Sequence, residues 1–240
     1  MAGSILGTRV LRTEDPELLT GQARYVADLH LDHPLHACFV RSEFAHARVV
    51  GVDVADAAAM PGVAAVLTHD DLGLAPFHGM AKVHNDFGRP PLADGVVRFV
   101  GEPVAVVLAE TAVQAKDAAD AVVVDYDPLP AVVDPEDAMA EGAPVIFPEH
   151  GDNVALAVTD PRNPGVFGDA EVIVRGRYVN QRMAVAPMEP HGVAAVPGDD
   201  GRLTVYGSTQ MPHVLQMGLA RALKVDKALV RVVTPHVGGG

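Results

Sequence analysis

Residues 96–126 read VVRFVGEPVAVVLAETAVQAKDAADAVVVDY and carry two kinds of pattern in alternation. Two apolar runs rich in β-branched residues, at 96–100 and 103–109, are separated by a Gly-Glu pair and predict two strands. A helical pattern follows them, and residues 122–126 predict a further strand. This alternation of strands and helix favours a mixed α/β layer, an α+β fold, over a sandwich of two sheets.

The helix in this stretch has a recognisable beginning. Thr111 and Gln114 stand as in a capping box, where the hydroxyl accepts from the amide three residues on and the glutamine reaches back. Apolar residues recur behind them at helical spacing and form a narrow stripe. Lys116 and Asp120 are one turn apart on the polar side, so we expect them to pair.

The rest of the chain is predicted to consist of short elements on both sides of this stretch. Before it, we expect strands at 35–40, 48–54 and 63–67, a short helix at 55–60, a turn at 68–71, a loop at 73–95 and an extended arm over about the first twenty residues. After it, an acidic, proline-containing segment is typical of a linker. Beyond the linker we expect strands at 170–178, 192–196, 203–207 and 229–233, and a helix that begins near Pro212.

Composition excludes several classes of protein. The 240 residues include 31 acidic and 18 basic ones, a net charge of −13 that argues against a general nucleic-acid binder. Hydrophobic residues make up 49%, enough for a folded core. A single cysteine, Cys38, excludes an iron–sulfur cluster or a cysteine-rich zinc site within this chain. The sequence shows neither a membrane-spanning run nor a signal-peptide pattern at its start, so a cytoplasmic location is expected.

Three candidate ligand-binding features lie in the last quarter of the chain. The glycine run that ends the chain could bring backbone amides close to a ligand, although a flexible tail has the same sequence. Gln210 lies between a predicted strand and a predicted helix, where its amide could bind a ligand or simply cap the helix. Residues 201–240 carry five basic residues and one acidic residue, a local charge of 5 − 1 = +4. This charge could attract a small anion, or the five cations could belong to a solvated helix face.

Other chemistry has weaker support. Glu189 could act as a base or an anchor, but a surface loop is the simpler interpretation. His30, His33 and His36 are spaced by three, yet Pro34 prevents a regular helix through them and a strand would turn His33 to the opposite face. We therefore predict no metal site built from these histidines.

Short motifs, in order along the chain, carry a resemblance to a known family. They are RTED at 12–15, LLTGQARYVAD at 18–28, LHACFVRS at 35–42, AHAR at 45–48, VGEPVA at 100–105, VDYDPLP at 124–130, NQR at 180–182, MEP at 188–190, STQ at 208–210 and VGGG at 237–240. Together they resemble the large subunits of molybdenum hydroxylases, a family that includes xanthine dehydrogenase, aldehyde oxidase and aerobic carbon monoxide dehydrogenase. The resemblance extends from about residue 7 to the last residue.

The resemblance implies a domain organisation and a set of cofactor contacts. Residues 1–19 would be an arm, 20–130 an α/β-hammerhead domain, 131–165 a linker and 166–240 the start of a molybdopterin-binding domain. In relatives, the glutamine that matches Gln210 lies beside the metal and hydrogen-bonds an oxo ligand. The family's glycine loop brings backbone amides to the cofactor and corresponds here to Gly238, Gly239 and Gly240. No residue of this chain is expected to bind the metal directly.

The resemblance also implies an activity. It is the oxidative hydroxylation of an aldehyde, a purine-like N-heterocycle or carbon monoxide with oxygen from water, on a molybdenum–molybdopterin cofactor that could have the cytosine dinucleotide form. Electrons would pass to 2Fe-2S clusters on a small subunit and FAD on a medium subunit, in a dimer of heterotrimers. The single cysteine agrees with iron–sulfur clusters on another polypeptide.

The sequence also departs from the family's pattern. The chain stops before the Phe-Gly that completes the family's glycine loop, and the family's catalytic glutamate would lie beyond residue 240. No catalytic residue is therefore assigned in this chain, Glu189 included, and the 240 residues alone are predicted to be inactive. His191 stands where many relatives have arginine. The alternative interpretation is a non-catalytic, standalone hammerhead-type module that serves assembly or subunit interaction.

Overall fold

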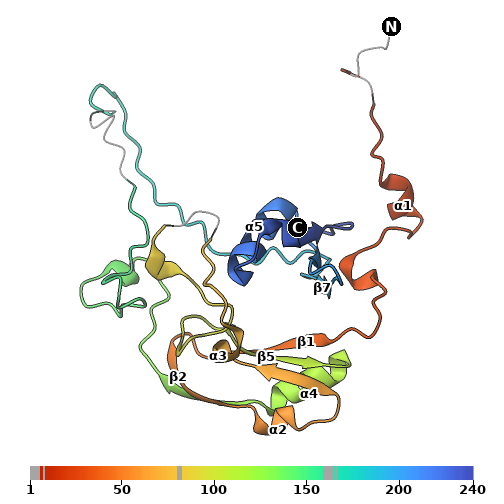
Figure 1. The fold of residues 1–240 in the computed structure, drawn as a ribbon. Coiled ribbons are helices and arrows are strands. Elements are labelled where there is room, and N and C mark those ends of the chain that lie inside the picture. Colours follow the sequence, from red (N-terminus) through yellow and green to blue (C-terminus); the bar gives the residue numbers. More distant parts are fainter. Residues whose placement is uncertain (1–5, 8, 80–82, 159–164, 166, 240) are drawn as a thin grey trace. The chain divides into compact units, whose positions relative to one another are not determined.

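The computed structural model describes residues 6–239 apart from 8, 80–82, 159–164 and 166, and the chain divides into two compact units. One unit combines Met1–Asp32 with Met183–Gly240, and the other is His33–Arg182. The His33–Arg182 unit has an α+β fold with two small antiparallel sheets (Figure 1). None of the described helices has the length and apolar character needed to cross a lipid bilayer.

The two sheets of the His33–Arg182 unit each have a central strand. In one, β5 pairs on both sides, in the order β1-β5-β3, and in the other β2 is central, in the order β4-β2-β6. The strands are β1 (His36–Arg41), β2 (Ala47–Asp53), β3 (Val63–Leu67), β4 (Val96–Val97), β5 (Pro103–Ala109) and β6 (Val123–Pro128). The helices of this unit are α2 (Ala55–Ala58), α3 (His69–Leu72), α4 (Ala112–Ala121) and the short 3-10 turns η2 (Asn85–Phe87) and η3 (Asp137–Met139).

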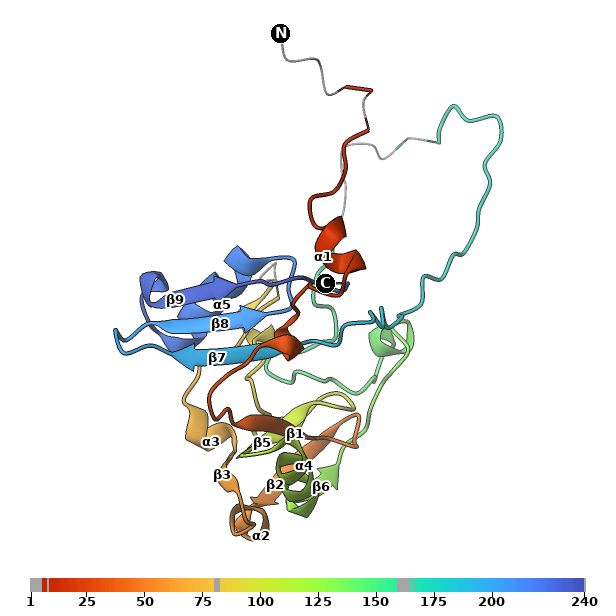
Figure 2. The same cartoon turned by 90° about the vertical axis from the view of Figure 1, so that its right-hand side faces the viewer.

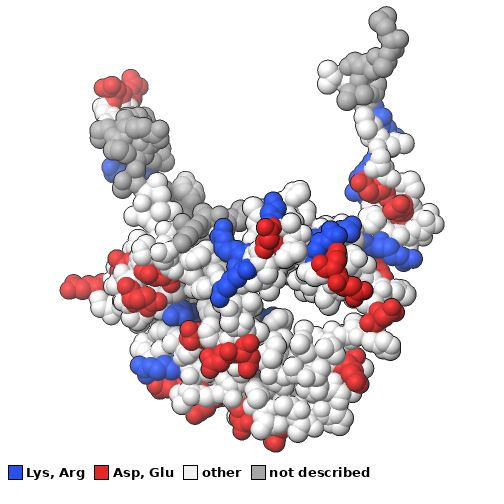
Figure 3. Space-filling view, viewed as in Figure 1, with Lys and Arg blue, Asp and Glu red and all other residues white. Residues whose placement is uncertain are grey.

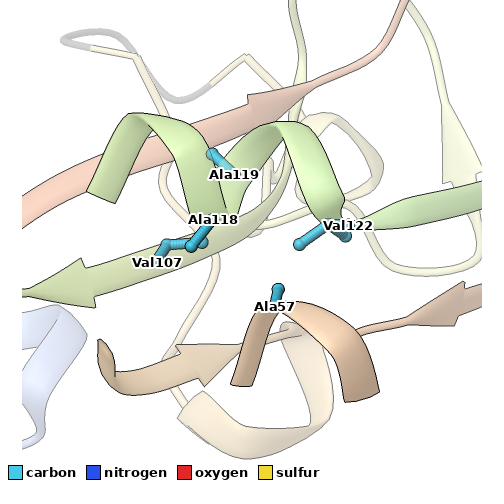
Figure 4. Packing of buried hydrophobic residues seen from close by; sticks show 5 residues of the cluster. All are labelled: Ala57, Val107, Ala118, Ala119 and Val122. Carbon is cyan, nitrogen blue, oxygen red and sulfur yellow. The ribbon is translucent and has the colours of Figure 1, made fainter. Parts of the chain in front are cut away.

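Small side chains let α4 lie close to the sheet. Ala118 and Ala119 pack with Val107 of β5, Val122 and Ala57 of α2 in one buried cluster (Figure 4). Alanine adds no rotamer entropy cost and little bulk, so the helix can approach the strand closely while it still excludes water. The apolar stripe predicted at Ala112, Ala115, Ala119 and Val122 is confirmed for the last three, whereas Ala112 is exposed and Ala118 is buried in addition.

The predicted start of α4 is confirmed, with one difference in detail. The hydroxyl oxygen of Thr111 accepts from the amide of Gln114 at 3.2 Å, as expected of an N-cap. The side chain of Gln114 reaches back to the Thr111 hydroxyl, which donates to its Oε1 at 2.8 Å, rather than to the backbone. Lys116 and Asp120 form the predicted ion pair.

Two local predictions for this unit were wrong. The strand predicted at 96–100 ends at Val97, because the amide of Arg98 donates to the carboxylate of Glu102 at 2.6 Å instead of to a strand neighbour. The turn predicted at 68–71 begins the helix α3. Asp71 Oδ2 accepts from the Thr68 amide at 2.7 Å and from its hydroxyl at 2.8 Å, and these bonds lower the pKa of Asp71.

The other unit is built on a three-stranded sheet covered by one helix (Figure 2). β7 (Val193–Pro197) pairs antiparallel with β8 (Leu203–Gly207), and β8 pairs parallel with β9 (Val230–Val233). The helix α5 (Pro212–Leu223) connects the two parallel strands, begins at Pro212 as predicted and packs against β9. The 3-10 turn η4 (Lys227–Leu229) leads into β9.

The N-terminal part of the same unit is not a plain extended arm. It contains the helix α1 (Asp15–Leu19), which has a proline in its first turn, and the 3-10 turn η1 (Val26–Asp28).

The strand predicted at 170–178 does not form. The residues there have no helix or strand, and the side chains of Val172 and Val174 are 78% and 86% exposed. β-Branched residues favour an extended backbone, but a strand also needs a neighbour for its amides and carbonyls. Within the described part of the chain no strand pairs with this segment.

Candidate functional site

Sheet topology brings the predicted ligand-binding residues to one edge. Gln210 follows the end of β8, and the glycine run follows the end of β9. Because β8 and β9 are adjacent and parallel, their carboxyl ends lie at the same edge of the sheet, where α/β sheets place their ligands. The structure therefore groups Gln210 with the glycine run at the level of topology.

The side chain of Gln210 is exposed and does not cap the following helix. The hydroxyl of Thr209 instead accepts from the amide of Met211, at 3.0 Å. Among the described residues, no hydrogen bond joins the Gln210 side chain to another group. The amide is thus available to a ligand, with one acceptor and two donor hydrogens.

The glycine run lies against the segment 187–189 of the same unit. The amide of Gly238 donates to Glu189 Oε2 at 2.5 Å, and the amide of Glu189 approaches the Gly238 carbonyl at 3.5 Å. A β-carbon added at Gly238 would lie 2.6 Å from Cβ of Glu189, and one added at Gly239 would lie 2.4 Å from Cβ of Pro187. These glycines therefore serve first to let two backbone segments approach, and Gly240 lies outside the described residues.

Glu189 has a structural role that the sequence did not reveal. One carboxylate oxygen holds the Gly238 amide, while the other, Oε1, is buried with no hydrogen-bond partner. The hydroxyl of Thr234, just after β9, is also buried and unpaired. A buried polar atom without a partner carries a desolvation penalty that a bound ligand or water would remove.

A second connection holds the segment after β9 to the start of the chain. The amide of Arg24 donates to His236 Nδ1 at 3.2 Å, and the amide of His236 donates to the Arg24 carbonyl at 3.0 Å. The other ring nitrogen of His236 lies 3.4 Å from a carboxylate oxygen of Glu17. His236 also lines an open pocket of about 560 Å³, together with Arg12, Tyr25 and Thr234. Sequence reasoning missed this connection because its members are 212 residues apart.

The basic residues of the last forty positions do not gather into an enclosed site. All five of Arg202, Arg221, Lys224, Lys227 and Arg231 are exposed. Figure 3 shows Lys and Arg side chains over the part of the surface that contains α5. Arg202 pairs with Asp200 at 2.7 Å, so one of the five charges is already balanced within the turn before β8.

Two family models match the chain and together define its class. The aldehyde oxidase and xanthine dehydrogenase a/b hammerhead domain matches residues 20–130, and the molybdopterin cofactor-binding domain matches residues 146–240. The chain thus contains a hammerhead domain followed by molybdopterin-binding sequence. The β7-β8-β9 sheet lies in the second of these. The chain is a member of the aldehyde oxidase and xanthine dehydrogenase family of molybdenum hydroxylase large subunits.

Individual relatives agree with this assignment. The chain is 40% identical to the nicotine 6-hydroxylase large subunit of Paenarthrobacter nicotinovorans over 250 residues, which cover 99% of the chain and 30% of that protein. It is 34% identical to the carbon monoxide dehydrogenase large chain of Afipia carboxidovorans, across 98% of the chain and 31% of the relative. Quinoline 2-oxidoreductase from Pseudomonas putida 86 superposes with a TM-score of 0.87 at 38% identity, covering 99% of this chain and 31% of the other. The chain therefore spans about a third of the length of these relatives.

The residues at the sheet edge suit a large polar cofactor such as molybdopterin. The Gln210 amide is exposed and unbonded, and Glu189 Oε1 and the Thr234 hydroxyl are buried polar atoms without partners. A cofactor with several hydrogen-bonding groups could bond both the exposed amide and the buried polar atoms that lack partners. The Gly238 amide already donates to Glu189, so this amide has a partner within the chain.

Proposed function

We propose that this chain is part of the large subunit of a molybdenum hydroxylase, and that Gln210, Gly238, Gly239 and Gly240 contact the molybdopterin cofactor. The observation that carries the proposal is the parallel pairing of β8 with β9, which brings Gln210 and the glycine run to one edge of the sheet. In the same proposal, residues 1–19 form an arm, 20–130 the hammerhead domain, 131–165 a linker and 166–240 the start of the molybdopterin-binding domain.

The chain's own residues would bind the cofactor and hold the glycine run in place. The amide of Gln210 would hydrogen-bond a group of the bound cofactor, and Glu189 would fix the glycine run by holding the Gly238 amide. When bound, the cofactor supplies the two-electron oxidation of an aldehyde, an N-heterocycle or carbon monoxide. No residue among these is assigned the role of catalytic base, and Glu189 in particular is a positioning residue.

Electrons would leave through partner subunits. We infer an iron–sulfur small subunit with 2Fe-2S clusters and an FAD-binding medium subunit, assembled as a dimer of heterotrimers in the cytoplasm, with the cytosine dinucleotide form of the cofactor as an option. Relatives named as a large subunit, a large chain and the gamma subunit of a dehydrogenase complex support a multi-subunit assembly. Nicotine, quinoline and carbon monoxide in the relatives' names support a small-molecule substrate.

The test begins with the source DNA downstream of the Gly240 codon. A reading frame that continues with Phe-Gly would be expressed whole, together with neighbouring subunit genes. Its molybdenum content would be measured by mass spectrometry and its activity by dye reduction with each substrate class. About one molybdenum per chain and substrate-dependent dye reduction are expected, and Gln210→Ala should lower the turnover number by at least about tenfold. A whole product that folds but holds no molybdenum would overturn the proposal.

The isolated 240-residue chain provides a separate check. We expect it to hold little or no molybdenum and to reduce no dye, because most of the relatives' length is outside it. Stoichiometric molybdenum and oxidation by the isolated chain would contradict this expectation. A stop codon directly after Gly240 would instead favour the standalone, non-catalytic module.

A further inference from the structure

A histidine-carboxylate cluster lies in the His33–Arg182 unit, within a part of the sequence that the molybdopterin proposal does not use. Asp86 Oδ2 lies 2.8 Å from His84 Nδ1 and 3.3 Å from His150 Nδ1. One potential ligand atom of each residue lies within 4.8 Å of those of the other two. Figure 1 shows the yellow helical turn around residue 86 close to the green segment that follows η3.

We propose that His84, Asp86 and His150 bind a divalent first-row transition-metal ion, with Zn²⁺ as the best match, in addition to any molybdenum cofactor. Two imidazoles and one carboxylate are a ligand set that zinc accepts, with an open position left for water. A tetrahedral ion with zinc–nitrogen distances of about 2.0–2.1 Å separates its ligands by about 3.3 Å. The separation of Asp86 Oδ2 from His150 Nδ1, 3.3 Å, equals that value, and its separation from His84 Nδ1, 2.8 Å, is shorter, so small side-chain rotations would complete the site.

Local structure places the first two ligands. His84 is the N-cap of the turn η2, and its Nδ1 lies 3.4 Å from the amide of Asp86. The turn therefore presents two ligands from positions only two residues apart. The spacing His-x-Asp is too common in sequences to predict a site, and its third member is 64 residues away.

A hydrogen-bonded loop places the third ligand. Asn153 Oδ1 accepts from the amide of Ile146 at 3.0 Å, and Asn153 Nδ2 donates to the carbonyls of Ala138 at 3.0 Å and Pro144 at 2.9 Å. The amide of His150 donates to the Phe147 carbonyl at 2.9 Å. The loop that carries His150 is thus held at several points by the chain itself, which is what a pre-formed ligand requires.

The surroundings of His150 suit a bound cation. Its Nε2 lies 3.3 Å from the Val154 carbonyl and its Nδ1 lies 3.3 Å from Asp86, so both nitrogens face oxygen atoms. A neutral imidazole has only one N–H, and if the carbonyl takes it, a lone pair of Nδ1 points at the carboxylate. A metal ion between them would turn this repulsion into coordination, and a histidine that donates its other N–H to a carbonyl is the usual arrangement around metals.

Burial and charge agree with the proposal. The His150 and Asp86 side chains are 19% and 26% exposed, whereas that of His84 is 52% exposed and provides a route for an ion. The ring of Phe87 packs on His150 with 4.6 Å between ring centroids and covers one side of the cluster. Among the described residues, the ion pairs of Asp86 are with these two histidines, and no lysine or arginine neutralises it.

The experiment uses the 240-residue chain without a histidine tag, stripped with a chelator and desalted. Zn²⁺ would be titrated in competition with a chromophoric chelator, and Co²⁺ would be followed by its visible absorption. We expect one ion per chain. Asp86→Asn and His150→Ala should each weaken the affinity by at least about tenfold, whereas His36→Ala, an exposed histidine in β1, should leave it unchanged.

A structural readout separates binding at this site from binding elsewhere. Hydrogen exchange should slow in residues 84–88 and 146–154 on addition of Zn²⁺, since the ion would tie the two segments together. If His150→Ala fails to fold, His84→Ala at the exposed ligand provides the same test. The proposal would be overturned if the folded wild-type chain bound no Zn²⁺, or if the Asp86→Asn and His84→Ala variants bound Zn²⁺ as tightly as the wild-type chain does. Because no molybdenum is needed, either result leaves the proposed oxidoreductase function untouched.

Discussion

Replacing glycine with alanine is expected to have opposite effects on the free energy of unfolding at two positions of the same unit. A β-carbon at Gly238 would lie 2.6 Å from Cβ of Glu189, whereas one at Gly218, inside α5, would meet nothing within 4 Å. We expect Gly238→Ala to lower the free energy of unfolding by about 1–3 kcal/mol through overpacking. Gly218→Ala should raise it by about 0.5–1 kcal/mol, because alanine is the better helix former. Urea unfolding of both variants tests this, and equal effects would contradict the close approach of Gly238 to Glu189.

At the scale of the element, the N-cap decides where α4 begins. Thr111 is exposed, and its hydroxyl accepts from the Gln114 amide, so its replacement removes a cap without opening a cavity. Thr111→Ala should lower the free energy of unfolding by about 1 kcal/mol. Lys116→Ala breaks only the exposed pair with Asp120 in the same helix and should change stability by less than about 0.5 kcal/mol. Thermal and denaturant melts would measure both, and a larger loss at Lys116 would show that the cap is not the important contact.

At the scale of the whole molecule, the chain has an exposed stretch without helix or strand. Arg175, Arg177 and Arg182 all lie in it, whereas the exposed Arg48 lies in β2 and pairs with Asp127. Proteases need several residues of unfolded backbone, so trypsin should cut readily at 175–182. Cleavage at Arg48 should be at least about tenfold slower, since it requires the sheet to open. Mass spectrometry of the first fragments would give the order of cleavage. Equal cleavage rates at Arg48 and at 175–182 would show that 170–182 is protected.

Local patterns were reliable where a contact is made between near neighbours. The cap at Thr111, the pair of Lys116 with Asp120 and the start of α5 at Pro212 all join residues within one or two turns. Such features depend on backbone geometry that a few adjacent residues fix by themselves. The family motifs are also local strings, and they identified the class of protein correctly.

Sequence patterns failed where another group competes for the backbone or where a strand finds no neighbour. The strand β4 ends at Val97 because the amide of Arg98 donates a hydrogen bond to the carboxylate of Glu102. The segment 170–178 has the composition of a strand but finds no partner among the described strands. In both cases the composition favoured a strand, but whether the backbone groups found strand partners depended on contacts that propensity does not describe.

The sequence by itself determined the family, the α+β class, most strands and helices, and the candidates Gln210 and the glycine run. Only the tertiary structure showed that Glu189 holds the amide of Gly238, 49 residues away, and that His84 and Asp86 meet His150. The physical reason is that short-range patterns fix backbone conformation, whereas contacts across many residues depend on how packed elements close the loops between them.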